Sequence, residues 1–165
     1  MKWLWRIGVV LLALFALQTF VLSTFVVANI SMSPNFRDGD IVLVSKIAST
    51  ERGDIVVVDG KQGLFTTGDV QYVIKRVIAV GGDRIACCDS TGKLLLNGKA
   101  LHEPYINGKP STISFDITLP EGSLWLMGDN RAKSMDSRDL LGLPGGGAVL
   151  EKHVVGEVMW VLWRK

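Results

Sequence analysis

The sequence predicts a mostly β domain, in which a coiled antiparallel β-sheet forms a barrel-like shape, preceded by one N-terminal transmembrane helix. Three observations lead to this prediction: an uncharged apolar stretch near the N-terminus, a series of short β-branched segments after it, and turn residues between those segments. No long segment after residue 30 has the periodicity of an amphipathic helix. A chain of 165 residues has room for one domain of ordinary size beside such an anchor.

The apolar stretch from Ile7 to Ala28 predicts the transmembrane helix. Asp, Glu, Lys and Arg are absent from residues 7–36, and a membrane span needs about 20 apolar residues. Lys2 and Arg6 precede the stretch. The positive-inside rule therefore places the N-terminus in the cytoplasm and the rest of the chain outside.

This reading divides the chain into two parts. Residues 1–28 are expected to form a short cytoplasmic tail and the anchor, and residues 29–165 are expected to form the exported β domain. The alternative is a cleaved signal peptide that ends at Val26-Val27-Ala28. Its hydrophobic region is usually about 7–15 residues long, so the longer stretch found here favours an anchor.

Strands are expected where β-branched and apolar residues run together between turn residues. Asn97-Gly98 separates two such short segments and is typical of a tight hairpin turn. Pro144–Gly147 predicts a flexible loop. The expected strands cover residues 41–44 with 46–47, 55–58, 70–80, 94–96, 99–101, 113–119, 123–127 and 154–163.

Composition excludes several classes of function. The net charge is only +2 and is dispersed along the chain, so nucleic acid is not an expected partner. Cys87-Cys88 lack the spacing of metal ligands and form either a vicinal disulfide or two free thiols. His102 and His153 are expected on the surface. No metal or other cofactor is expected.

The segment Asn29–Pro34 holds a serine where the apolar stretch ends. Pro34 has a fixed φ and no amide proton, so an extended or turn conformation is expected here. Ser31 then lies on a stiffened backbone between Ile30 and Met32. Taken alone, a loop beside the membrane without catalytic function is the simpler interpretation.

Lys75 is a second candidate, because it lies inside a predicted strand among apolar residues. Alternation along the strand sends Lys75 to one face and Arg76 to the other, so one of them approaches a buried or ligand-facing side. Free lysine has a pKa of about 10.4, and lowering it by ~3 units takes roughly 4 kcal/mol of desolvation. A neutral amine formed in this way accepts the proton of a serine hydroxyl. The alternative is a lysine on a solvated face of the sheet.

A third polar segment, Gly128–Arg138, follows directly after apolar residues 124–127. Arginine pairs with carboxylates through two parallel hydrogen bonds, so the segment predicts either a solvated loop or an internal polar network. In such a network, Arg131 and Arg138 are expected to pair with Asp129 or Asp136. The hydroxyl of Ser134 is suited to orient a neighbouring amine. The predicted network consists of Asp129, Asn130, Arg131, Asp136 and Arg138.

In their order along the chain, these motifs resemble those of the bacterial type I signal peptidases, which are membrane-anchored Ser-Lys endopeptidases. The resemblance covers nearly the whole exported domain, and four motifs in order behind an apolar segment are specific. The four motifs are Ser31-Met32-Ser33-Pro34, Arg52–Val57, Ile74–Val77 with Gly82-Asp83, and Gly128–Arg138. Leu96–Lys99 with Glu103-Pro104-Tyr105 is also similar to the family.

The resemblance implies a role for each candidate. Ser31 is implied to be the nucleophile, neutral Lys75 its general base, and Ser134 a residue that orients the lysine, while the Asp129–Arg138 network braces the site. The backbone N–H of Ser31 is the implied first oxyanion donor. Asn29 stands where the family often has a hydroxyl residue or glycine, and we expect its amide to be a second donor. The implied substrate contacts are Ile30, Met32, Val73 and Ile74.

The implied activity is the removal of signal peptides from exported preproteins after small residues at −1 and −3. The implied place is the outer face of the bacterial cytoplasmic membrane, with preproteins and the lipid bilayer as partners. The sequence departs from the family at Val73, Ala132 and Lys133, where Tyr, Asp and Asn are common. Two alternatives stay open: a relative dedicated to one substrate, such as a conjugation pilin, and a non-catalytic membrane-anchored module that binds peptides. The oligomeric state stays open as well.

Overall fold

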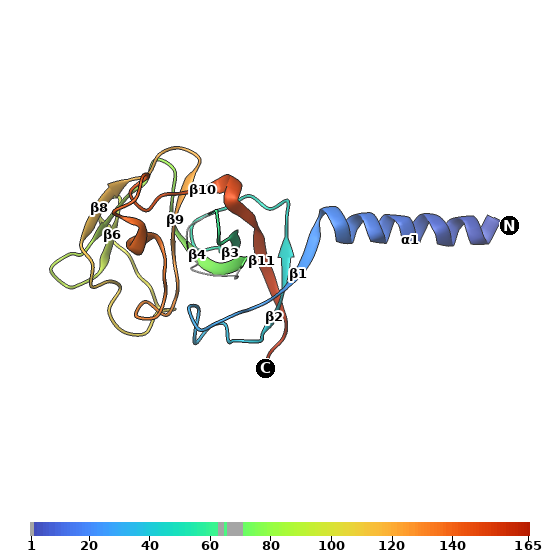
Figure 1. Ribbon diagram of the computed structural model, residues 1–165, viewed down its shortest axis with the longest axis horizontal. Helices are drawn as coiled ribbons and strands as arrows, with labels where there is room; N and C mark the ends of the chain where they lie inside the picture. Colours follow the sequence, from blue (N-terminus) through green and yellow to red (C-terminus); the bar gives the residue numbers. More distant parts are fainter. Residues whose placement is uncertain (1, 63–64, 66–70) are drawn as a thin grey trace.

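The computed structural model describes residues 2–62, 65 and 71–165 and shows a helix that projects from a β domain (Figure 1). The helix α1 (Lys2–Phe20) leads directly into the first strand, β1 (Leu22–Val26). The remaining helices in the described residues are two short 3-10 turns, η1 (Ser137–Leu140) and η2 (Glu151–His153). The predicted mostly β fold with a coiled antiparallel sheet is therefore confirmed.

The described residues contain two antiparallel sheets. The larger sheet has the strand order β1-β2-β11-β3-β4-β9-β10, and the smaller has the order β7-β6-β5-β8. The larger sheet is built from β1, β2 (Ile41–Ser45), β3 (Ile55–Asp59), β4 (Tyr72–Val80), β9 (Ser123–Met127), β10 (Val149–Leu150) and β11 (Val154–Trp163). The smaller sheet is built from β5 (Arg84–Cys87), β6 (Leu94–Leu96), β7 (Lys99–Ala100) and β8 (Phe115–Thr118).

Most of the predicted strands are found, and β9 and β11 have the predicted bounds. The predicted start of β4 at Val70 lies outside the described residues. Besides β1, two strands, β5 and β10, were not predicted, because each is four residues or shorter and borders a turn. At the predicted hairpin, Asn97 and Gly98 have φ values of 52° and 78°, which suit the tight turn between β6 and β7.

The predicted helix Ile7–Ala28 has the wrong bounds. The helix begins at Lys2 and ends at Phe20, and Leu22–Val26 pairs along its whole length with β2. The segment after Phe20 is rich in β-branched residues, which favour a strand when a partner strand is available. No helix in the described part of the chain combines the length and apolarity needed to cross a membrane.

Three hydrophobic clusters form the core. The first packs side chains of β3, β4, β9 and β10 in the larger sheet against one another and consists of Val56, Val58, Phe65, Val73, Val77, Leu124, Leu126, Leu140 and Val149. The second lies between the two sheets and contains Ile78, Ala79, Ile85, Leu94, Phe115, Leu119, Trp125 and Met127. The third packs the chain after β1 onto β2, β3 and β4 with Val27, Met32, Val42, Val44, Val57 and Ile74.

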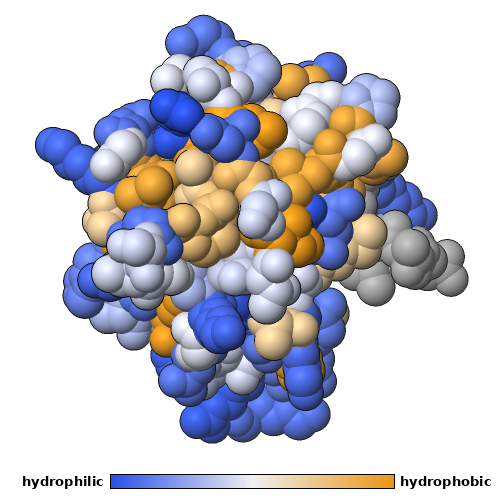
Figure 2. Space-filling view, turned by 90° about the vertical axis from the view of Figure 1, so that its left-hand side faces the viewer, coloured by the Kyte–Doolittle hydropathy of each residue, from blue (hydrophilic) through white to orange (hydrophobic). Residues whose placement is uncertain are grey.

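The smaller sheet lies at the end of the molecule opposite α1 (Figure 1). Seen from that end, polar residues surround a more hydrophobic central area (Figure 2). Cys87 and Cys88 form a disulfide bond at the end of β5, which settles the two readings of this pair in favour of the vicinal disulfide.

An ion pair connects two turns that the sequence singles out, Arg52-Gly53-Asp54 and Gly81-Gly82-Asp83. Arg52 Nε donates to Asp83 Oδ2 at 2.6 Å, and Asn97 Nδ2 donates to Asp83 Oδ1 at 2.8 Å. Burial opposes ionisation of Asp83, but these donors and the backbone N–H of Val80 outweigh it, so the pKa of the carboxyl lies below its ordinary value. Asp83 thereby ties β4 to the smaller sheet.

We expect Asp83→Asn to lower the free energy of unfolding at pH 7 by about 1–2 kcal/mol, because it removes a charge-assisted hydrogen bond. The effect stays small because the Arg52 side chain is 51% exposed and solvent screens the pair. Since folding lowers this pKa, the stabilisation is present above about pH 4 and is lost as the pH falls further. Urea unfolding at pH 7 and pH 3 measures this stabilisation. The free energy of unfolding of Asp83→Asn should change less between the two pH values than that of the wild type.

The control for this prediction is Asp116→Asn, which breaks the exposed Arg84–Asp116 pair. Exposed ion pairs contribute little to stability, so this variant should unfold like the wild type. An equal loss of stability in both variants would contradict a special role for the buried carboxylate.

Candidate active site

The structure brings Ser31 and Lys75 together from positions 44 residues apart. Ser31 lies in the loop between β1 and β2, and Lys75 lies in the middle of β4. Lys75 Nζ donates to Ser31 Oγ at 3.1 Å. Both residues are buried, with exposed fractions of 8% for Ser31 and 2% for Lys75. This distance permits direct proton transfer between the hydroxyl and the amine.

Packing in β4 explains the electrostatics of the lysine. Lys75 pairs with Val56 of β3 and lies between Val73 and Val77, which belong to the same core cluster as Val56. Burial lowers the pKa of Lys75 from 10.5 to about 8, against the opposing attraction of Asp136 and Asp139. About one lysine in ten is then neutral at pH 7, compared with one in a few thousand for a free lysine.

Two kinds of contact fix the loop that carries Ser31: a buried side chain and hydrogen bonds from Asn130. Met32 is fully buried in the third hydrophobic cluster, so it anchors the residue next to the serine. Asn130 holds the loop through two hydrogen bonds: its backbone N–H donates to the Ser31 carbonyl at 2.9 Å, and its Nδ2 donates to the Ile30 carbonyl at 3.1 Å. The predicted network residue Asn130 therefore contacts the nucleophile loop directly.

Asn29 contacts the serine backbone in a way that differs from the prediction. Asn29 has a φ of 79°, and its Oδ1 accepts the backbone N–H of Ser31 at 3.0 Å. Its own backbone N–H donates to Asp38 Oδ1 at 2.8 Å. In the free protein, the Ser31 N–H expected to stabilise an oxyanion is therefore already hydrogen-bonded to Asn29.

The predicted hydrogen bond from Ser134 to Lys75 is absent. Ser134 Oγ is buried and has no hydrogen-bond partner among the described residues. A Cβ added to Gly128 would lie 2.6 Å from Ser134 Cβ and would also overlap the Ser31 carbonyl oxygen. Ser134 therefore packs against Gly128, beside the peptide group of the nucleophile, and leaves Lys75 bonded to Ser31.

The polar network differs from the prediction in its pairing. Asp129 is fully buried and pairs with Arg76 through two hydrogen bonds of 2.8 Å, and Asn35 Nδ2 adds a third at 2.8 Å. The Arg76 guanidinium also lies over the ring of Tyr105, 4.0 Å from its centre. This cluster joins β4, the chain after Ser31, and the Gly128–Arg138 segment.

The second half of the network includes one predicted pair and one that was missed. Arg138 and Asp136 form the predicted bidentate pair, with two hydrogen bonds of 2.8 Å. Arg131 instead pairs with Glu103, and both side chains are buried. Glu103 and Tyr105 belong to a segment noted for its resemblance to the family, which was the available signal for their place near the site.

The four predicted substrate contacts separate into two groups. Ile30 is 45% exposed beside the serine, while Met32, Val73 and Ile74 are buried. Met32 and Ile74 belong to the same cluster, and Val73 faces the opposite side of β4. Ile30 is therefore the member of this set that is open to solvent next to Ser31.

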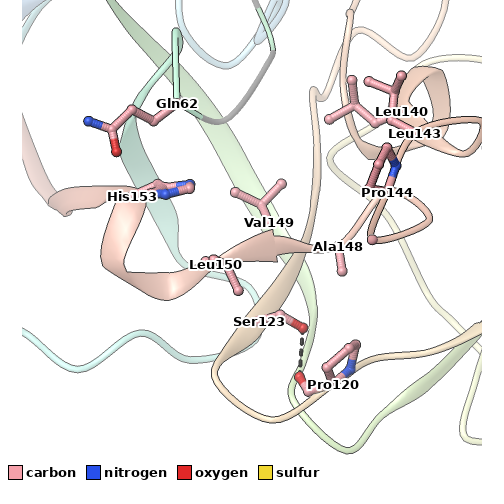
Figure 3. A pocket seen from close by; sticks show the side chains of 12 residues that line it. Gln62, Pro120, Ser123, Leu140, Leu143, Pro144, Ala148, Val149, Leu150 and His153 are labelled. Carbon is pink, nitrogen blue, oxygen red and sulfur yellow. Dashed lines mark hydrogen bonds between the residues drawn. The ribbon is translucent and has the colours of Figure 1, made fainter.

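A cavity of about 260 Å³ has a lining that includes residues of η1, β10 and η2 (Figure 3). None of the predicted site residues lines it. His153 does, although it was expected on the surface: it is half-buried, and its Nδ1 has no hydrogen-bond partner among the described residues. The remaining lining residues are mostly apolar and include Pro120, Leu140, Leu143, Pro144, Val149 and Leu150.

Comparison with known proteins shows which family the chain belongs to. The family model described as "Signal peptidase, peptidase S26" matches residues 1–163. A signal peptidase I of Bacillus licheniformis is 33% identical over 176 residues, covering 98% of this chain and 88% of the relative. Signal peptidase I T of Bacillus subtilis (strain 168) is 34% identical over 175 residues, covering 96% of this chain and 84% of the relative.

The fold is also similar to that of a solved structure of a signal peptidase I. The crystal structure of a signal peptidase I from Enterococcus faecalis V583 superposes with a TM-score of 0.53 at 27% sequence identity. The match covers 68% of this chain and 99% of that chain.

Proposed function

Because the chain belongs to the signal peptidase family, peptidase S26, we propose that it removes N-terminal signal peptides from exported preproteins with Ser31 as nucleophile and neutral Lys75 as general base. The observation that carries this proposal is the 3.1 Å hydrogen bond between the buried Lys75 Nζ and Ser31 Oγ. A serine hydroxyl needs an adjacent base to act as a nucleophile, and a neutral lysine in an apolar site provides one.

The reaction proceeds in two stages. Ser31 Oγ attacks the carbonyl carbon of the residue at −1 and transfers its proton to Lys75 Nζ. As the peptide bond breaks, the Lys75 ammonium returns this proton to the leaving amine of the mature protein. Lys75 then accepts a proton from the water that attacks the acyl-enzyme ester, and Ser31 recovers a proton when the signal peptide leaves.

The surrounding residues position these two groups. The Arg76–Asp129 pair, through Asn35, and Asn130 hold the nucleophile loop against β4. The Arg138–Asp136 pair fixes the Gly128–Arg138 segment, since Asp136 Oδ2 accepts the Gly128 N–H and Arg138 donates to the Arg131 carbonyl. Ser134 has a free hydroxyl beside the site, and we assign it to steadying the lysine after the lysine gains its proton. The substrate binds as an extended strand, with its small residues at −1 and −3 near Ile30 and the first half of β4, where β3 pairs on one side and the pairing with β9 has not yet begun.

The proposed place of action is the outer face of the bacterial cytoplasmic membrane. Trp3 and Trp5 on α1 are exposed, as are Trp160 and Trp163 on β11. Strands β1 and β11 both flank β2, so the exposed residues of β11 lie near the strand that follows α1 (Figure 1). Exposed tryptophans favour the interface between lipid and water, so we assign these surfaces to contact with the bilayer.

The test uses the full chain in lipid vesicles with a model preprotein that has alanine at −3 and −1. We expect a single cut after the −1 alanine, read from the N-terminus of the product, and no cut when −1 is tryptophan. Flotation of the same vesicles on a density gradient tests the membrane contact, and protein left at the bottom would contradict it. If the folded protein binds the peptide but does not cleave it, the result would instead support a non-catalytic module that binds peptides.

A further inference from the structure

The backbone N–H of Ser31 has a partner before any substrate arrives. Asn29 Oδ1 accepts this N–H at 3.0 Å. An amide nitrogen cannot accept a hydrogen bond, so the side-chain oxygen must be the atom that faces the N–H. The proposed function requires the same N–H to stabilise the negative charge on the carbonyl oxygen of the substrate. Asn29 Oδ1 therefore occupies the place where that oxygen must bind.

The backbone on both sides of this contact is held in place. The Asn29 N–H donates to Asp38 Oδ1 at 2.8 Å, and the Gly39 N–H donates to the Val27 carbonyl at 2.8 Å, which closes the segment into a hairpin. On the other side, the Ser31 carbonyl accepts the Asn130 N–H at 2.9 Å. Asn29 itself is exposed, so its side chain is the part that can rotate away without disturbing the core.

We propose that Asn29 is a positioning residue that caps the oxyanion hole: its side-chain carbonyl holds the Ser31 N–H until the carbonyl of a bound substrate displaces it. This inference rests on the proposed function, because only an acyl substrate supplies the competing carbonyl. A substrate peptide that binds in the wrong position leaves the hydrogen bond between Asn29 Oδ1 and the Ser31 N–H in place. The oxyanion then lacks its backbone donor. The cap thereby couples correct seating of the substrate to assembly of the site.

The variants Asn29→Gly and Asn29→Asp separate the cap from a merely structural role. Glycine removes the side chain and tolerates the φ of 79° at this position, whereas alanine would be strained there. Aspartate keeps the accepting oxygen and loses the amide protons. The matched control is Asn97→Gly, which changes the other asparagine with a positive φ among the described residues. It likewise removes side-chain hydrogen bonds, those that Asn97 makes with Asp83 and with the Arg84 N–H beside the β6–β7 hairpin, and it leaves the Asn29–Ser31 contact untouched.

The first measurement is hydrogen exchange of the Ser31 amide by NMR, on the full ¹⁵N-labelled chain in detergent without substrate. We expect exchange to be about 5- to 10-fold faster in Asn29→Gly and unchanged in Asn29→Asp and Asn97→Gly, because the hydrogen bond protects the amide. Equal exchange rates in the wild type and Asn29→Gly would overturn the proposal. This measurement needs no catalysis, so it decides the cap even if preprotein cleavage fails.

The second measurement is the Kd of a peptide that spans a cleavage site with alanine at −3 and −1. It uses Ser31→Ala protein, which cannot cleave the peptide but keeps the backbone N–H of residue 31. Adding Asn29→Gly should tighten binding about 2- to 10-fold, because the substrate carbonyl no longer displaces an internal hydrogen bond. Weaker binding in the double variant would show that the side chain attracts the substrate and would overturn the cap.

Discussion

Lys75→Met lowers kcat for preprotein cleavage by about 10⁴- to 10⁶-fold, the loss typical when a serine hydrolase loses its nucleophile or base. Ser31→Ala should give a similar loss, and the double variant should be no worse than either, because the two residues act as one unit. The measurement is single-turnover cleavage of the model preprotein. Lys133→Met is the matched control, since Lys133 is exposed in the neighbouring segment, and its activity should equal that of the wild type.

The same substitution separates chemistry from folding. Burial holds the pKa of Lys75 at about 8, so the unfolded chain binds more protons than the folded chain between about pH 8 and 10.5, and stability rises with pH across that window. Below pH 8 the fold carries the full cost of the buried ammonium, up to about 3 kcal/mol. Lys75→Met should therefore be more stable than the wild type at pH 7, and the difference should shrink as the pH rises toward 10.5.

The pH dependence of the wild type follows from the same residue. Because only neutral Lys75 accepts the Ser31 proton, log kcat/KM should rise with a slope of about one below pH 8 and become level above it. Lys133→Met should keep this profile. A rate that is constant from pH 6 to pH 9 would mean that a different group takes the proton.

Local sequence signals were sufficient for most of the fold, because β9 is an apolar run between Gly122 and Gly128, and β11 is a long segment rich in valine and tryptophan. They failed at the N-terminal helix. Hydrophobicity alone does not distinguish Leu22–Val26 from the preceding helix, and its strand conformation depends on β2, which begins fifteen residues after β1 ends. A strand that forms through a distant partner cannot be read from its own composition.

The candidate site shows the same limit. The resemblance to a family placed Ser31 and Lys75 together, whereas the spacing of residues says nothing about which arginine pairs with which carboxylate. Asp129 lies two residues from Arg131 yet pairs with Arg76, because the β4–β9 register places Arg76 beside Met127. Asn29 was expected to donate to the substrate, and its oxygen instead faces Ser31, a choice set by the backbone conformation of the loop.

Gly128→Ala lowers kcat by at least about 10²-fold, because the new methyl group would displace the nucleophile. A Cβ at this position would lie 2.6 Å from Ser134 Cβ and even closer to the Ser31 carbonyl oxygen. That carbonyl is held by the Asn130 N–H at 2.9 Å, so it cannot move without breaking a hydrogen bond. Displacing a reacting group by about 1 Å typically costs about 10²-fold in rate. Overpacking of this kind also costs about 1–3 kcal/mol of stability.

Single-turnover cleavage and urea unfolding measure the two effects. Gly142→Ala is the control, because no atom lies within 4 Å of a Cβ added at Gly142, and both its rate and its stability should match the wild type. The pH profile distinguishes displacement from loss of the base: Gly128→Ala should keep its inflection near pH 8, since Lys75 is untouched, whereas Lys75→Met should lose it. Full activity in Gly128→Ala would show that the Ser31 loop tolerates movement, and the close contact between this glycine and the nucleophile would then have no part in catalysis.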